Sequence, residues 1–94
     1  MTIENRKWFA LEVAQMYLTR DMAARGWVAG QWPIKQGEAE KWLPCLEQVR
    51  GCAILLEGQV IRVINKYHLH DFTFTDIREA VPFAEAWAAW SEAQ

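Results

Sequence analysis

The first quarter of the chain has the hydrophobic periodicity of an amphipathic helix. Apolar side chains recur in steps of three and four residues, at Trp8, Leu11, Ala14, Leu18 and Met22. This spacing is typical of one helical face that turns towards a core. Gly26 follows the pattern and can adopt the left-handed conformation that ends many helices. The pattern therefore predicts one long N-terminal helix over residues 2–25.

The next two segments have less regular patterns. Residues 26–33, GWVAGQWP, combine two glycines with a proline and are typical of a loop. Trp27 directly follows the helix-ending glycine, and we expect it to pack back onto the helix. Trp32 has no such local partner, and we expect it to contact another chain. Residues 36–50 are rich in helix formers but contain Pro44, which predicts a middle helix broken at that proline.

Two short apolar runs predict an antiparallel strand pair over residues 52–57 and 60–65, with Gly58 in the turn. In both plausible registers, three aliphatic side chains share one face: Ile54, Ile61 and Val63. Residues 68–74 alternate again and indicate a third strand, with His68 and His70 on one side.

A C-terminal helix should begin at Asp76, which can cap it, and Pro82 is expected to interrupt it. Phe83, Trp87 and Trp90 then form one aromatic stripe along this helix. The predicted fold is α+β: one domain over residues 1–94, in which a small antiparallel sheet of two or three strands is packed on one face by the helices.

The composition adds a further expectation about the tryptophans. Hydrophobic residues make up 52% of the 94 residues, and six of them are tryptophan. One small core cannot enclose six indoles, so we expect at least one or two to be exposed or buried against another chain. Cys45 and Cys52 do not form a disulfide framework, and no secretory signal or membrane-spanning run is evident. These features predict a cytoplasmic protein with reduced cysteines.

Protein binding is the leading functional interpretation. Tryptophan is enriched among residues that dominate interface energetics, and three tryptophans are the candidate protein-binding residues: Trp32, Trp87 and Trp90. The sequence favours a small non-enzymatic module without a cofactor, of the kind that a phage or plasmid would use to inhibit or regulate a host protein sterically. A homodimer formed through a sheet edge or the last helix would also cover exposed tryptophans.

Two alternatives remain open from the sequence. The first is a nucleic-acid-associated accessory protein that uses basic and stacking side chains, with the candidates Arg62, Lys66, Tyr67, His68 and His70. The net charge of −2 and the absence of a basic run argue against generic phosphate binding. The second alternative is a metal-binding or hydrolytic domain built on His68 and His70, although the sequence shows no further ligand pair.

Overall fold

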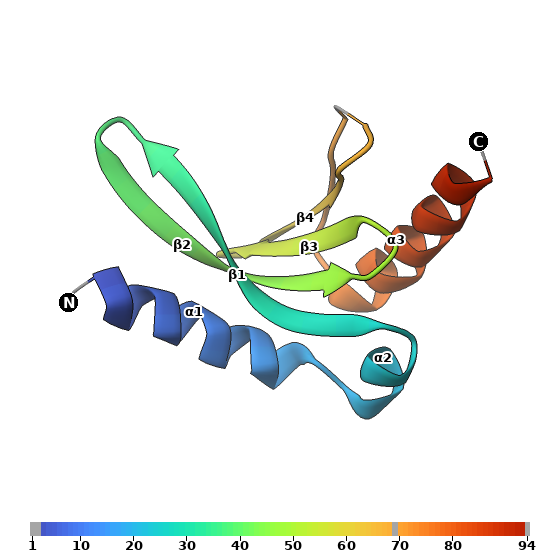
Figure 1. Cartoon of the computed structure of the whole chain (residues 1–94), viewed down its shortest axis with the longest axis horizontal. Helices are drawn as coiled ribbons and strands as arrows, with labels where there is room; N and C mark the ends of the chain where they lie inside the picture. Colours follow the sequence, from blue (N-terminus) through green and yellow to red (C-terminus); the bar gives the residue numbers. More distant parts are fainter. Residues whose placement is uncertain (1–2, 69, 94) are drawn as a thin grey trace.

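The computed structural model describes residues 3–68 and 70–93 and has an α+β fold with a five-stranded antiparallel sheet and three helices (Figure 1). The elements, in chain order, are α1 (Ile3–Tyr17), α2 (Arg20–Ala24), β1 (Trp27–Gln36), β2 (Ala39–Gln48), β3 (Cys52–Glu57), β4 (Val60–Asn65), β5 (Phe72–Phe74) and α3 (Ile77–Glu92). The strand order β1-β2-β3-β4-β5 follows the sequence, so each strand pairs with the next one.

Two glycines set the register of the two hairpins. Gln36 pairs with Ala39 across a two-residue turn that begins at Gly37, whose φ is 65°. The β3–β4 hairpin uses the same arrangement at Gly58, with a φ of 66°. A glycine at positive φ in the first position is typical of tight hairpins, because their twist matches that of the strands.

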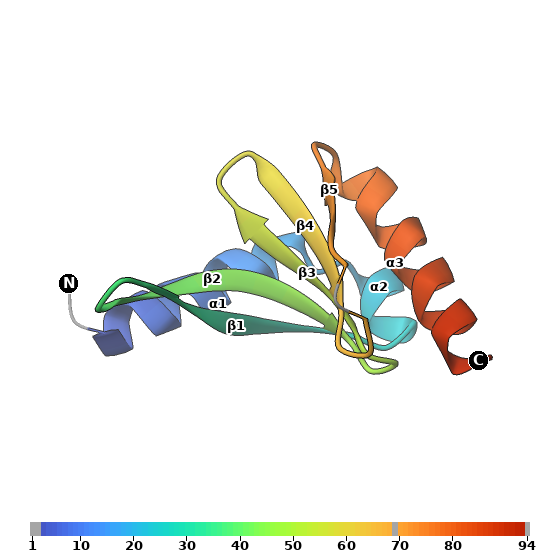
Figure 2. The same ribbon diagram turned by 90° about the horizontal axis from the view of Figure 1, so that it is seen from above.

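Both long helices cover the same face of the sheet. α1 packs on β1 and β2, and α3 packs on β3, β4 and β5, so the two helices divide this covered face between them (Figures 1 and 2). The helices contact the sheet through fully buried small side chains: Ala10 and Ala14 on α1, and Ala80, Ala84 and Ala88 on α3. Alanine contacts let a helix lie close to a sheet, and they leave the larger aromatic side chains of both helices on their flanks.

The predicted Pro-broken middle helix is wrong: residues 39–48 form strand β2. Pro44 pairs with Gln31 of β1 and precedes the stretch in which β2 also pairs with β3. A proline is tolerated at such a position because one side of the strand needs no donor. Ladder pairing along all ten residues of β1 outweighs the helix propensity of this segment, and the predicted loop over residues 26–33 is largely strand as well.

The single long N-terminal helix is also wrong in detail. α1 ends at Tyr17, and Thr19 begins the separate helix α2 because its side chain accepts a hydrogen bond from the Met22 backbone N–H at 3.1 Å. The predicted core stripe is confirmed at Ala14 and Met22, which are buried, but it is wrong at Trp8, which is 61% exposed. Thr2, at which the predicted helix starts, lies outside the described residues.

The predicted strand pair is confirmed, with Ile54 opposite Val63 and both buried on the covered face. The third strand is real but shorter than residues 68–74, because β5 contains only Phe72–Phe74. His68 and His70 therefore lie outside the sheet. α3 begins after Asp76 as predicted but continues through Pro82 without a break.

Candidate interaction surfaces

The second face of the sheet carries no helix, and we call it the bare face. Strand alternation and the register place nine apolar side chains on it: Val28, Trp32, Ile34, Leu43, Cys45, Ala53, Leu55, Val60 and Ile64. A solvent-facing side of an antiparallel sheet normally alternates to polar residues. The bare face departs from this rule and is the first candidate interaction surface.

The centre of the bare face is buried by the sheet itself. Leu43, Cys45 and Leu55 are only 3%, 0% and 4% exposed. Three partly buried side chains pack against this cluster: Trp32 and Ile34 from β1, and Ile64 from β4. Burial, with a smaller contribution from the Glu47 carboxylate, raises the pKa of the Cys45 thiol to about 12. A thiol with this pKa is inert at neutral pH, so Cys45 is a packing residue.

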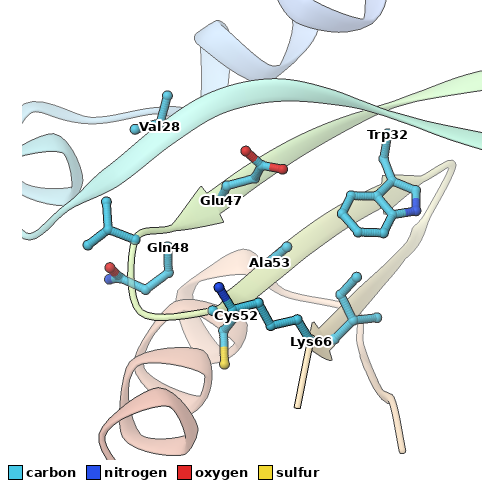
Figure 3. Close-up of a pocket in the computed structure, with 10 residues that line it drawn as sticks. Val28, Trp32, Glu47, Gln48, Cys52, Ala53 and Lys66 are labelled. Atoms are coloured by element: carbon cyan, nitrogen blue, oxygen red, sulfur yellow. The ribbon is translucent and has the colours of Figure 1, made fainter. Parts of the chain in front are cut away.

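A hollow of about 350 Å³ opens beside this centre. Figure 3 shows the indole of Trp32 at one side of it and Ala53 at its floor, while the Cys52 sulfur points away towards α3. Glu47 and Lys66 line the hollow on either side of Ala53, from β2 and from the end of β4 (Figure 3). The hollow therefore combines an apolar floor with one acidic and one basic group at its rim.

A chain of ring contacts forms the second candidate surface, which we call the aromatic strip. It runs along β5 and α3, and its neighbouring ring centroids lie 5.0–5.9 Å apart. Its members are His68, Phe72, Phe74, Phe83, Trp87 and Trp90. Tilted and edge-on pairs at these distances are the favourable arrangements for aromatic rings.

The strip is buried at one side and exposed at the other. Phe83 and Trp87 pack against the core, so part of the predicted stripe docks α3 on the sheet. Phe72 and Trp90 are 44% and 52% exposed. The structure thus brings together Trp87 and Trp90, which the sequence suggested, and adds Phe72, which it missed. The signal for Phe72 in the sequence was the alternation of residues 68–74, which places Phe72 on the same side as His68.

The five candidates for nucleic-acid binding do not form one basic surface. Arg62 lies on the bare face, where its guanidinium is 3.4 Å from Glu57 and 3.3 Å from Asp71. Lys66 stacks over the Tyr67 ring at 5.1 Å. His68 instead belongs to the aromatic strip, and His70 is exposed. Two carboxylates beside Arg62 reduce its attraction for a phosphate.

Among the described residues, no group of three or more histidine, cysteine, aspartate or glutamate side chains could hold a metal ion. Within residues 3–68 and 70–93, no helix has the length and apolar character that crossing a membrane requires. Comparisons with protein-family models, curated proteins and solved structures found no significant match. The functional argument therefore depends on the two surfaces themselves.

Proposed function

We propose that this protein is a non-enzymatic, cytoplasmic protein-binding module that docks on its partner through the exposed side of the aromatic strip. The supporting observation is that Phe72, Trp87 and Trp90 gather on one surface while two of them stay about half exposed. Aromatic side chains are the residues most often found as interface anchors, because they bury a large area at little conformational cost. A surface of this kind favours protein binding over catalysis.

The proposed mechanism is steric. α3 is linked to the rest of the fold by its side chains, because Arg25 pairs with Glu85 at 2.6 Å and Asn65 donates a hydrogen bond to the Ser91 hydroxyl at 2.8 Å. A third link joins Arg50 of the β2–β3 loop to Glu92 at 2.7 Å. A surface fixed in this way loses little entropy on binding. Such a module would inhibit or regulate a host protein by covering its working site, as a phage or plasmid product could.

The test is capture of a partner by the tagged chain, with and without nuclease, followed by binding measurements on the purified partner. We expect Trp90→Ala and Phe72→Ala each to weaken binding by tenfold or more, as anchor residues do. Trp8→Ala is the matched control, because Trp8 is 61% exposed but lies on α1. Equal affinities for all three variants would contradict the proposal.

Nuclease treatment separates the main alternative from this proposal. The pair formed by Lys66 and Tyr67, next to His68, is the observation that favours nucleic acid. If the captured material disappears with nuclease, and if Lys66→Ala lowers its recovery more than Trp90→Ala does, the protein is a nucleic-acid accessory factor. Zinc that stays bound through dialysis would instead indicate the metal-binding alternative at His68 and His70.

A further inference from the structure

The chain buries the centre of the bare face with its own side chains, but among the described residues no helix covers the apolar side chains around that centre. α1 and α3 both pack on the opposite face, and α2 contacts β1 beside Met22 and Trp27 of that same core. Layered folds bury each apolar sheet face against another element. On the bare face, Val28 is 53% exposed at the edge of the hollow, and Val49 beside it is 72% exposed.

We propose that a second copy of this chain covers the bare face, and that the two copies pack bare face to bare face about a two-fold axis. In this arrangement Glu47 of each copy pairs with Lys66 of the partner subunit, across the hollow. The proposal concerns a different surface from the aromatic strip, so it stands or falls independently of the proposed function.

Charge complementarity is the argument for a second copy over another protein. Glu47 and Lys66 are exposed, carry opposite charges and lie on either side of Ala53 at the hollow (Figure 3). Within the described residues, neither has an ion-pair partner, and Lys66 contacts only the Tyr67 ring among charged or aromatic groups. A two-fold axis places Glu47 of one copy opposite Lys66 of the other, and the reverse. A surface that carries both a positive and a negative charge beside an apolar centre is therefore complementary to itself.

The exposed apolar side chains of the face also suit this arrangement. A stable interface buries roughly 800 Å² on each partner, which is about one eighth of the 6405 Å² surface of this chain. The half-buried Trp32 and Ile64 would lie at the centre of that contact. The exposed Val28 and Val49 lie beside the hollow, where each could enter the hollow of the second copy. An apolar centre with charged groups at its rim is the usual anatomy of a homodimer interface.

Sedimentation equilibrium on the purified chain tests the proposal through charge reversal. We expect the unaltered protein to be a dimer at micromolar concentration. Glu47→Lys and Lys66→Glu should each raise the dimer dissociation constant by roughly tenfold or more, because each single change replaces two attractions by two repulsions. The double variant Glu47→Lys/Lys66→Glu should restore the dimer, since the reversed charges pair again across the axis.

Glu38→Lys and Lys35→Glu are the matched controls, because both residues are exposed near the β1–β2 turn and neither belongs to the bare face. All variants should keep the same circular dichroism spectrum, since the substituted side chains are exposed. A monomer at every concentration up to about 100 times that range would overturn the proposal. So would a dimer that ignores both single reversals, because another surface, such as the exposed Phe9 and Met16 of α1, would then hold it together. Failure of the double variant to restore the dimer would refute the two-fold pairing.

Discussion

On the covered face of the sheet, Trp27, Ile54 and Val63 are buried beneath helices, whereas on the bare face Cys45 and Leu55 reach nearly the same burial with no helix above them. The covered face closes by packing a separate layer onto the sheet. The bare face closes because the sheet's own edge, through Trp32 and Ile34, lies against its centre. The bare face therefore has only a partial cover, which consists of a single layer of side chains from the sheet itself.

The same comparison explains where the tryptophans lie. The helices approach the covered face through alanines, and the tryptophans of the helices lie beside these contacts, where Trp87 still packs against the core. Two indoles of the covered face come from the sheet: Trp27, which is only 2% exposed, and Trp42, whose ring lies 5.0 Å from the Lys7 ammonium of α1. Trp32 completes the bare face, while Trp8 and Trp90 remain on the outer flanks of the helices, at 61% and 52% exposure. Exposed tryptophan is thus a consequence of alanine-mediated packing as well as a candidate for binding.

The largest effect is expected in the reactivity of the two cysteine thiols. This reactivity tests whether the side chains over the bare face exclude water. Cys45 lies on the bare face and Cys52 on the covered face, and burial raises the pKa of both thiols, to about 12 for Cys45. At pH 8, a thiol with a pKa of about 12 is thiolate in roughly one molecule in ten thousand, so Cys45 should not react with a disulfide reagent until the chain unfolds. Cys52 is buried as well and its pKa is raised, so we expect it to be protected in the folded chain. Single Cys→Ser variants identify the reacting thiol. Rapid native reaction of Cys45 alone would mean that the bare face opens to water.

Trp27→Ala and Trp32→Ala compare the two faces by stability. Loss of the enclosed Trp27 should cost about 3–5 kcal/mol of unfolding free energy, and loss of the half-buried Trp32 only about 1–2 kcal/mol. Denaturant unfolding at one low protein concentration measures both changes. Trp27→Phe is the control, because it keeps a ring and removes an indole N–H that has no hydrogen-bond partner among the described residues. If Trp32→Ala unfolds the protein while Trp27→Ala leaves it unchanged, the division between a structural and an intermolecular tryptophan is wrong.

These faces also show how far the sequence could predict the fold. β3, β4 and α3 were predictable because each repeats its own pattern and because Gly58 marks a turn. β1 and β2 were not, since one contains glycine and proline and the other is rich in helix formers. Only their mutual pairing over ten residues makes them strands. Gly37 before Glu38 was the available signal, and it is the same type of signal as Gly58 before Gln59.

The candidate surfaces were predictable in part for a similar reason. The spacing of Trp87 and Trp90 along one helix places them together without knowledge of the fold. Phe72 joins them through the β4–β5 pairing, and His68 joins them from the loop between these two strands, so neither position follows from the spacing along α3. The bare face required the register of four strands, so the sequence identified Trp32 as unusual but could not show which side chains surround it.

A third prediction concerns the alanine contacts of the covered face. Ala84 is fully buried between α3 and the sheet, and Ala84→Leu should destabilise the fold by about 1–3 kcal/mol through overpacking. Ala89→Leu on the same helix is the control. Ala89 is exposed, and its substitution should change the unfolding free energy by less than about 0.5 kcal/mol. Equal effects of the two substitutions would mean that α3 does not depend on close contact with the sheet.

The smallest effect is expected at the start of α3, where Asp76 caps the helix. α3 is one of the two long helices that pack on the covered face and are absent from the bare face. The Asp76 carboxylate accepts hydrogen bonds from the Arg78 backbone N–H at 2.9 Å and from its guanidinium at 2.8 Å. The hydrogen bonds from the Arg78 side chain, and then from its backbone, hold the pKa of Asp76 below its ordinary value of 3.8.

A lowered folded-state pKa stabilises the protein above pH 3.8, and this contribution is lost as the pH falls through the folded value. Asp76→Asn keeps an acceptor for the backbone N–H but removes the charge. Its melting temperature should therefore lie slightly below that of the unaltered protein at neutral pH, and the gap should close below pH 3.8. Glu38→Gln, in the exposed β1–β2 turn, should show no such gap at either pH. A gap that persists unchanged in acid would mean that Asp76 acts through its shape alone, and that the charge at this end of α3 contributes nothing to holding the helix on the sheet.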